Sequence, residues 1–350
     1  MTTRSRSVWQ QMPAKERRAI GASVGSAGLP TAALALYARW WQLETWLRSL
    51  LYVELRAAHG VDWASHIGQG ALSRQEKDKL RTYMASPDWD DPLAYLDVGK
   101  LFPLLDNSWD LVGPSLFEQS AFQGRVNELL AIRNRIGHLR RPHADDLSRL
   151  EQTLRDLEKG AFEALASYNR EAYIDEHLQD PVADAWIAGN HRTARRLIDH
   201  AQRQYDTDIR VTYTKRPWAG PLDSGDPISG SRGYLWRVDF IMRGRHLNIP
   251  ALWRDSYLDR HARKLLVHLI VRHASGVSVV FPAVDNSVEI SDAIGDVFDA
   301  VLANSSTFPP GVSLKGDYLA RIPPLDPRVQ ISTGWTIVDD TTVPITIFAA

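Results

Sequence analysis

The residues with the clearest potential for chemistry lie together near the middle of the chain. Between Arg133 and Arg141, nine residues include four arginines and one histidine, with an asparagine among them. Histidine takes or gives a proton near neutral pH, and arginine holds phosphate through two parallel hydrogen bonds and stabilises developing negative charge. An adjacent amide can fix the orientation of the imidazole ring. These residue types suit phosphodiester cleavage; the alternative is an ordinary basic helix end that complements the helix dipole.

The spacing of these residues determines which of them one helix brings together. Asn134 and His138 are four residues apart, so they share one helix face, separated by about 40° around the axis. Arg133 lies roughly 140° around the axis from His138. One straight helix does not bring this pair together, although Gly137 could relax the last turn. The pair converges more easily if two copies of the helix meet across a twofold axis.

The segment from Ile132 to His138 (Ile-Arg-Asn-Arg-Ile-Gly-His) resembles the Arg-Asn-x-x-x-His signature of HEPN domains, an α-helical superfamily found in many RNA-cleaving toxins and defence proteins. Two upstream segments resemble parts of one HEPN subgroup. Residues 44–48, continuing to His59-Gly60, are similar to its first long helix, and residues 95–110 are similar to a segment that often precedes the signature. The resemblance covers about residues 37–168.

The resemblance implies a metal-independent endoribonuclease, active as a homodimer in which the paired motif helices form one cleft. His138 would assist attack by a ribose 2′-hydroxyl on its own 3′ phosphate, which leaves a 2′,3′-cyclic phosphate. Arg133 would bind that phosphate, and Asn134 would orient the catalytic groups. No cofactor and no metal ion are expected at such a site.

The resemblance leaves the roles of the remaining arginines and the wider setting open. Arg135, Arg140 and Arg141 would either follow the RNA backbone or form a solvated face. By analogy the protein belongs to a prokaryotic defence or toxin system, with a neutralising or sensor protein as a further candidate partner. The alternative function is a non-catalytic HEPN scaffold that binds RNA or a protein.

Apolar residues spaced by three and four predict that about the first two hundred residues are all helical. Ser73 with Glu76 three residues later has the capping-box spacing, and Asp180-Pro181 is a typical helix start. The expected helices cover residues 31–58, 73–84, 93–105, 109–116, 124–136, 145–168, 181–186 and 193–205.

From about residue 207 the pattern changes to that of strands and helices together. Residues 209–214 and 234–242 alternate with period two, and a loop rich in Gly, Ser and Pro separates them. The apolar run at 265–273 fits either a strand or a helix. Further strands are expected at 277–281, 329–337 and 343–348, and a helix at 287–302.

The sequence therefore predicts a multidomain protein, an N-terminal all-α HEPN helical bundle followed by a C-terminal α+β domain. The expected parts are a flexible segment (1–30), the HEPN-like helical domain (31–175), a helical connector (176–206) and an α+β domain of unknown family with a sensor or regulatory role (207–350).

Other sets of potential ligands have simpler interpretations. Four carboxylates recur along the expected helix at 287–302 and could hold Mg²⁺, but a solvated helix face is far more common; they are Glu289, Asp292, Asp296 and Asp299. Three histidines, His261, His268 and His273, lack the spacing of a zinc motif. Residues 225–233 lack the Gly-Lys-Ser/Thr of a phosphate-binding loop.

The composition of the 350 residues is that of a globular protein, with 44% hydrophobic and 24% charged residues, which excludes wholesale disorder. The chain has no cysteine, which excludes a disulfide scaffold, a thiolate zinc site and a cysteine nucleophile. The absence of cysteine fits a cytoplasmic protein. The low-charge residues 19–38 contain three glycines and a proline and are not expected to span a membrane.

The net charge of −1 is a cancellation between regions. Residues 1–191 carry 22 basic and 25 acidic side chains, residues 192–283 carry 16 and 8, and residues 284–350 carry 3 and 9. In the basic middle block, aromatic residues such as Trp218 and Trp236 stand among arginines. This mixture can stack on bases and contact phosphates, although such aromatics more often form the core of strands. A basic block here would guide RNA toward the helical cleft.

Overall fold

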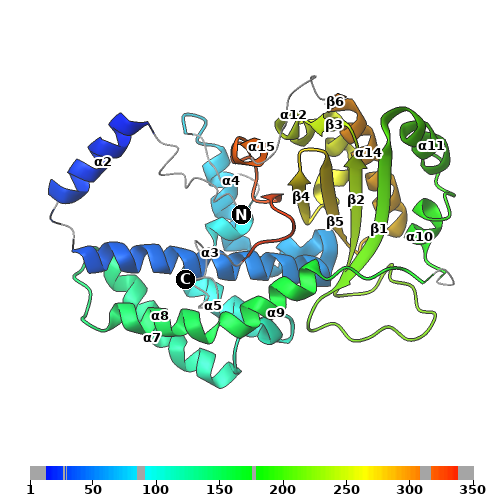
Figure 1. Cartoon of the computed structure of the whole chain (residues 1–350). Helices are drawn as coiled ribbons and strands as arrows, with labels where there is room; N and C mark the ends of the chain where they lie inside the picture. Colours follow the sequence, from blue (N-terminus) through cyan, green and yellow to red (C-terminus); the bar gives the residue numbers. More distant parts are fainter. Residues whose placement is uncertain are drawn as a thin grey trace.

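The first part of the chain is helical and the second part combines helices with a sheet, as the sequence predicted (Figure 1). The computed structural model describes residues 13–26, 28, 30–84, 91–175, 179–307 and 317–337. The change from helices to strands falls at Thr207, where the first strand begins.

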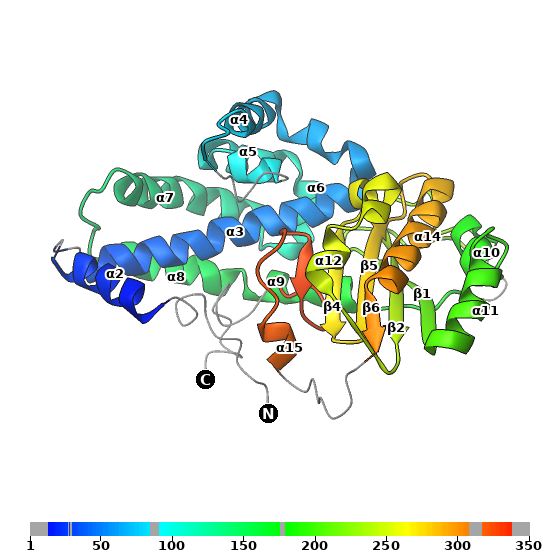
Figure 2. The same cartoon turned by 90° about the horizontal axis from the view of Figure 1, so that it is seen from above.

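The helical part is built along α3 (Thr31–His59), a helix of 29 residues and therefore about 44 Å long. It forms because apolar side chains recur every three or four residues with no interior glycine or proline. Figures 1 and 2 show α3 running from α2 at one end to the sheet at the other. It ends at Gly60, whose φ is 56°, and a Cβ there would overlap the Asp285 carboxylate.

The remaining elements of the helical part follow in chain order. They are α2 (Ala14–Ser26), η1 (Gly60–Ile67), α4 (Gln69–Lys79), η2 (Pro92–Tyr95), α5 (Val98–Asn107), α6 (Trp109–Val112), η3 (Gly113–Ser115), α7 (Gln119–Gly137), α8 (Asp146–Asp156), α9 (Glu158–Asn169), α10 (Pro181–Trp186) and α11 (Ala194–Tyr205). The segment expected to be flexible, residues 1–30, contains α2, which buries none of its described residues.

Several helix boundaries differ from those predicted. The helix expected to start at Ser73 begins at Gln69, behind Gly68 with its φ of 87°, so the capping-box spacing was misleading. The helix expected from residue 124 begins at Gln119, because the Glu118 carboxylate caps it by accepting hydrogen bonds from two backbone N–H groups. The helix expected at 145–168 is divided at Leu157 into α8 and α9.

The α+β part contains a five-stranded sheet in the order β1-β2-β5-β4-β7. Neighbouring strands are antiparallel except β4 and β7, which are parallel. The strands are β1 (Thr207–Lys215), β2 (Tyr234–Met242), β4 (His268–His273), β5 (Gly276–Pro282) and β7 (Val329–Ile331), and a separate pair is formed by β3 (Arg245–Leu247) and β6 (Ser305–Thr307). The helical elements of this part are α12 (Ile249–Trp253), η4 (Leu258–Ala262), α13 (Arg263–Leu265), α14 (Ser287–Ala303) and α15 (Asp317–Ala320).

The ambiguous apolar run at 265–273 thus contains a strand, β4. The strand expected at 329–337 is confined to Val329–Ile331, and the strand expected at 343–348 lies outside the described residues.

The sheet separates two hydrophobic cores. On one face, sheet residues such as Leu235, Ile270 and Val280 belong to the core of the helical part. On the other face, residues such as Val238 and Phe240 pack with α14. The alternation of side chains along each strand explains how one sheet serves both cores. The helical part therefore completes its core with one face of the sheet.

A buried ion pair joins the two parts. The carboxylate of Glu54, on α3, accepts hydrogen bonds from Arg216 Nε at 3.0 Å and from Trp218 Nε1 at 2.7 Å. Glu54 and Arg216 are both fully buried. Arg216 also donates to the Ala164 carbonyl and the Ser167 hydroxyl on α9. One guanidinium therefore ties α3 and α9 to the end of β1.

We predict that Glu54→Gln lowers the free energy of unfolding by about 3–5 kcal/mol, because it leaves the buried Arg216 without a counter-charge. Urea denaturation measures this loss. The control is Glu151→Gln, whose half-exposed carboxylate lies 3.7 Å from Arg39 and whose loss should cost less than about 1 kcal/mol. Equal effects of the two substitutions would contradict this account.

Candidate functional site

The motif recognised in the sequence lies at the carboxyl end of α7. Phe122, Leu129 and Ile132 are the buried residues of this helix and belong to the core shared with α3; Figure 2 shows the two helices side by side. This packing fixes one face of α7 and leaves Asn134, on another face, exposed.

Helix α7 ends in a Schellman turn, with His138 as the first residue beyond the helix. The backbone N–H of Arg140 donates to the Arg135 carbonyl at 2.8 Å, and that of Leu139 donates to the Ile136 carbonyl at 3.2 Å. The turn gives Leu139 a φ of 55°, a conformation that usually belongs to glycine. The His138 backbone is thus held where the chain leaves the helix.

The guanidinium of Arg133 packs beside Gly137, close enough to touch a side chain placed there. A Cβ atom on Gly137 would lie 3.4 Å from Nη1 and 3.7 Å from Cζ of Arg133. The guanidinium therefore lies against the backbone immediately before His138. The backbone positions of Arg133 and His138 remain about 140° apart around the helix axis, as the spacing predicted. The guanidinium and the imidazole form no hydrogen bond with each other.

Five side chains of the motif make neither a hydrogen bond nor an ion pair with the described part of the chain: Arg133, Asn134, His138, Arg140 and Arg141. Arg133 is half-buried and the other four are exposed. Three of the five are arginines, so this end of α7 carries positive charge that nearby carboxylates do not neutralise.

Arg135 differs from its neighbours because it is tied to a buried carboxylate. Its guanidinium donates two hydrogen bonds to Asp146, which is 1% exposed, and the backbone N–H of His143 donates to the same carboxylate at 2.9 Å. Burial raises the pKa of Asp146, but the hydrogen bonds from Arg135 and His143 outweigh burial and hold that pKa below its usual value. The pair of Arg135 and Asp146 therefore fixes the connection between α7 and α8.

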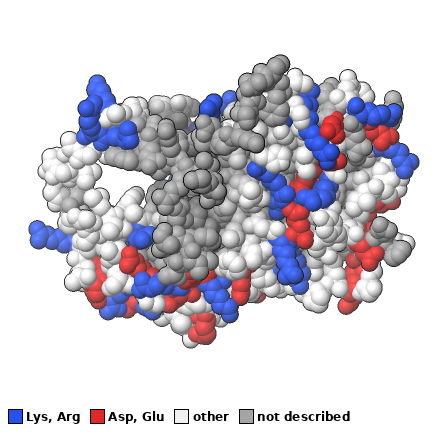
Figure 3. Space-filling model, viewed as in Figure 1, with Lys and Arg blue, Asp and Glu red and all other residues white. Residues whose placement is uncertain are grey.

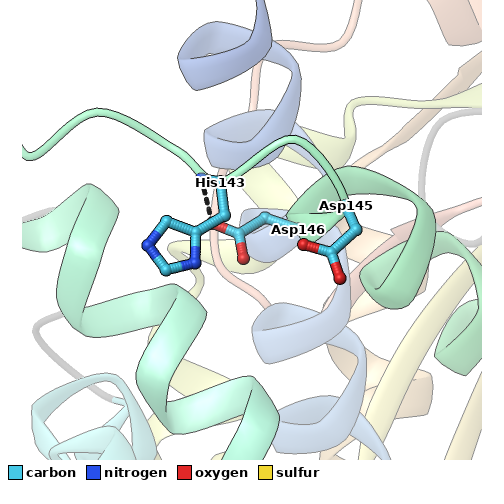
Figure 4. Close-up of side chains that lie close together, drawn as sticks. All are labelled: His143, Asp145 and Asp146. Carbon is cyan, nitrogen blue, oxygen red and sulfur yellow. Dashed lines mark hydrogen bonds between the residues drawn. The ribbon is translucent and has the colours of Figure 1, made fainter.

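One group of potential metal ligands lies close together in the described part of the chain. The ligand atoms of His143, Asp145 and Asp146 are within 4.8 Å of one another (Figure 4). Both carboxylates already have cationic partners, since Arg135 holds Asp146 and Arg149 Nε lies 2.6 Å from Asp145 Oδ2. A metal ion would compete with two guanidinium groups here, so the chemistry of this group does not favour a metal centre.

A pocket of about 180 Å³ opens between α3 and α7, next to the motif. Arg133 and Gly137 line it from α7, and Tyr37, Trp41 and Glu44 line it from α3. At the sequence level the aromatic residues of α3 look like part of an apolar helix face. Their spacing held a signal, because Tyr37 and Trp41 do not follow the positions that form the core face of the helix.

The carboxylates considered as a magnesium site have separate partners. Glu289 pairs with Lys264 at 2.9 Å, Asp292 lies 3.1 Å from a ring nitrogen of His191, and Asp296 lies 2.8 Å from a ring nitrogen of His261. Burial and the neighbouring Asp296 raise the pKa of the fourth carboxyl, Asp299.

The histidines considered as a zinc site are used separately. His268 is buried in β4, and its Nδ1 lies 2.7 Å from the Tyr168 hydroxyl. Burial and nearby arginines lower the pKa of His268 to about 3, so the ring is neutral. His261, on η4, and His273, at the other end of β4, are exposed.

The basic middle block does not form a continuous basic surface over the sheet. Arg210 Nη2 lies 2.7 Å from Asp239, and Arg237 and Arg272 pair with Glu171. Figure 3 shows acidic and basic side chains next to one another over this region. Aromatics of this block that could have stacked on bases are buried in the core, which is the more common role of such residues; they are Tyr234, Trp236 and Trp253.

Comparison with known proteins gives no relative: no family model, no curated protein and no solved structure matches this chain. Among the described residues, the helices are too short or too polar for any of them to cross a lipid bilayer. The function must therefore be argued from the site itself.

We predict that Asp146→Asn lowers the free energy of unfolding by about 1–3 kcal/mol at neutral pH, because it removes the charged acceptor of Arg135. Since the pKa of Asp146 is lowered in the folded protein, its stabilising contribution is complete above the ordinary pKa of about 3.9 and is lost as pH falls through the lowered value.

Thermal unfolding at pH 7 and at acid pH measures this dependence. The difference between Asp146→Asn and the parent should shrink at the acid pH, and Asp145→Asn, at an exposed position, should unfold like the parent. Parent-like stability of Asp146→Asn at pH 7 would show that the ion pair does not hold this connection.

Proposed function

We propose that this protein is a metal-independent endoribonuclease of the HEPN type. The observation that carries the proposal is the end of α7, where Arg133, Asn134 and His138 all lack partners in the described part of the chain. Side chains of this kind that are not needed for the fold are available to a ligand. The charge of Arg133 and its position against Gly137, next to His138, favour a ligand with a phosphate group.

The proposed reaction divides the work among three side chains. The His138 imidazole takes the proton from a ribose 2′-hydroxyl, whose oxygen then forms a bond to the adjacent phosphorus. The bond from phosphorus to the 5′ oxygen of the next nucleotide breaks, and that oxygen leaves as a hydroxyl after it gains the proton that His138 took up. Arg133 stabilises the negative charge that builds up on the phosphate oxygens, and Asn134 orients the reacting groups.

The arginines of the motif have different roles in this proposal. Arg140 and Arg141, which are exposed and have no partner among the described residues, contact the RNA backbone. Arg135 acts through Asp146 and positions the end of α7. It is therefore a positioning residue and does not contact the RNA backbone.

Leu139 supports the proposal that two copies of the chain form one cleft. Its side chain is 92% exposed although its backbone has the left-handed conformation, which costs roughly 1–2 kcal/mol for a residue other than glycine. Within one chain the leucine side chain contacts almost nothing, so the strained backbone brings no packing in return. A second protein surface that packs against this leucine would explain why the strain is kept. We therefore propose that the homodimer forms across the end of α7.

The remaining parts of the proposal rest on the resemblance to HEPN proteins. They are a cytoplasmic role in defence or as a toxin, a neutralising or sensor partner protein, and a regulatory role for residues 207–350. The shared core and the Glu54–Arg216 pair give the α+β part a physical connection to α3 through which it could act.

We predict that the purified protein cleaves RNA in the presence of EDTA and leaves 2′,3′-cyclic phosphate ends. His138→Ala should slow cleavage about 10²- to 10⁴-fold, the usual contribution of a general acid or base, and Arg133→Ala should slow it by a similar factor. Gel analysis of labelled RNA and mass spectrometry of the ends measure both effects.

The matched control is His143→Ala, an exposed histidine beyond the motif that belongs to the group in Figure 4. It should cleave RNA at the parent rate, whereas loss of activity in this variant together with inhibition by EDTA would indicate metal-dependent chemistry. Binding of RNA by all variants without cleavage by any of them would instead identify a non-catalytic binding module.

We predict that Leu139→Asp raises the dissociation constant of the dimer at least about tenfold, because it places a charge in the proposed interface. Analytical ultracentrifugation measures the constant. Leu80→Asp is the control, because Leu80 is 79% exposed near the end of α4, away from the motif. A parent that is monomeric at all concentrations would exclude the composite cleft.

A further inference from the structure

Two large aromatic side chains next to the motif are exposed to solvent. Tyr37 and Trp41 on α3 are 58% and 64% exposed, and their ring centroids are 6.4 Å apart. Trp40, between them in the sequence, is 5% exposed and belongs to the core. The fold of α3 thus uses one tryptophan and leaves its neighbour on the surface, where it forms part of the pocket that opens toward Arg133.

Of the charged side chains Glu44 and Arg133 that line this pocket, only Glu44 has an oppositely charged partner among the described residues. Glu44 accepts hydrogen bonds from Trp40 Nε1 at 2.6 Å and from Arg48 Nη2 at 2.5 Å. Its charge is therefore already balanced by Arg48, which also donates to the Leu96 carbonyl. The guanidinium of Arg133 has no such partner in the described part of the chain, so the pocket joins exposed rings to an uncompensated positive charge.

These properties define the occupant. The pocket of about 180 Å³ is smaller than the usual site of a drug-sized ligand and suits a single planar ring. An apolar side chain from a second copy would cover the rings but would bury Arg133 without a counter-charge. A nucleotide unit satisfies both features, since its base stacks on aromatic rings and its phosphate pairs with arginine.

We propose that this pocket is a subsite for an unpaired RNA base, which stacks on Trp41 and Tyr37 while its phosphate contacts Arg133. This inference rests on the proposed ribonuclease function and defines its substrate class. A base inside a duplex is already stacked and cannot enter, so the substrate is single-stranded at this position. Because every base can stack on an aromatic ring, the subsite requires a base but does not distinguish one base from another.

The test uses two single-stranded probes made of 2′-O-methyl RNA, which lacks the attacking hydroxyl and stays intact. One probe carries its bases and the other has the same backbone with abasic positions. Fluorescence anisotropy gives the dissociation constant of each probe for the parent, for Trp41→Ala and for Trp41→Phe. Tyr83→Ala is the control, because this tyrosine is 81% exposed outside the pocket.

Trp41→Ala should weaken binding of the base-containing probe about tenfold, within the range of about 5- to 150-fold expected for one stacked base. It should leave binding of the abasic probe unchanged. Trp41→Phe should recover most of the affinity because it keeps a ring, and Tyr83→Ala should bind both probes like the parent.

Three results would overturn the subsite: equal binding of the base-containing probe by the parent and Trp41→Ala, equal losses on both probes, or conversion of a dimer to monomers by Trp41→Ala. The last result would assign the pocket to a second copy of the chain. Base-dependent binding by a parent that does not cleave RNA would leave the subsite standing and remove the nuclease. Cleavage that depends on His138, together with parent-like binding of the base-containing probe by Trp41→Ala, would support the nuclease and exclude the subsite.

Discussion

The carboxylate of Glu54 and the guanidinium of Arg216, both removed from water, hold the architecture of this protein together. Burying two charges is costly unless their geometry and further hydrogen bonds compensate, and here Trp218, Ala164 and Ser167 supply those bonds. The pair fixes one end of α3 between α9 and the sheet. Because α3 is continuous, its other end, about 26 Å from Glu54 at Tyr37, takes its position from this anchor.

The candidate site depends on that position in two ways. Helix α7 packs on α3 through the shared core, and the pocket beside Arg133 exists only because the two helices lie side by side. The Schellman turn and the Arg135–Asp146 pair then fix where the chain leaves α7. Arg133, Asn134 and His138, for which the resemblance to HEPN domains implies a function, are among the motif side chains that have no partner in the described part of the chain.

The side chains at this site can transfer a proton and can stabilise negative charge. The nearby carboxylates Asp145 and Asp146 have guanidinium partners, and Glu44 is balanced by Arg48. Arg133 and His138 remain available, which suits a reaction that stabilises a phosphate and transfers a proton. Arg135 differs from the neighbouring arginines because its guanidinium is paired with a carboxylate. That carboxylate belongs to Asp146, eleven residues later in the chain.

The sequence predicted the long elements with strong patterns. Helix α3 and strand β2 have nearly the expected bounds, because α3 repeats apolar residues at helical spacing and β2 is an apolar run interrupted only at the alternate positions Arg237 and Asp239. Boundaries set by a few polar contacts were missed, such as the Glu118 cap of α7. Long-range pairings were also beyond reach, since nothing near Arg135 or Glu54 in the sequence identifies Asp146 or Arg216 as its partner. The exposure of Trp41 could not be predicted from the sequence either, because it depends on which side of α3 the other helices cover.

In the proposed reaction, His138 and Arg133 cleave RNA by using the 2′-hydroxyl of the RNA itself. The most direct measurement replaces that hydroxyl by hydrogen at one mapped cleavage position of an RNA substrate and follows cleavage there in EDTA. The proposed mechanism predicts that cleavage at the 2′-deoxy position is abolished while neighbouring sites are cut as before. Continued cleavage at the 2′-deoxy position would contradict it, because the attacking oxygen would then have to come from water.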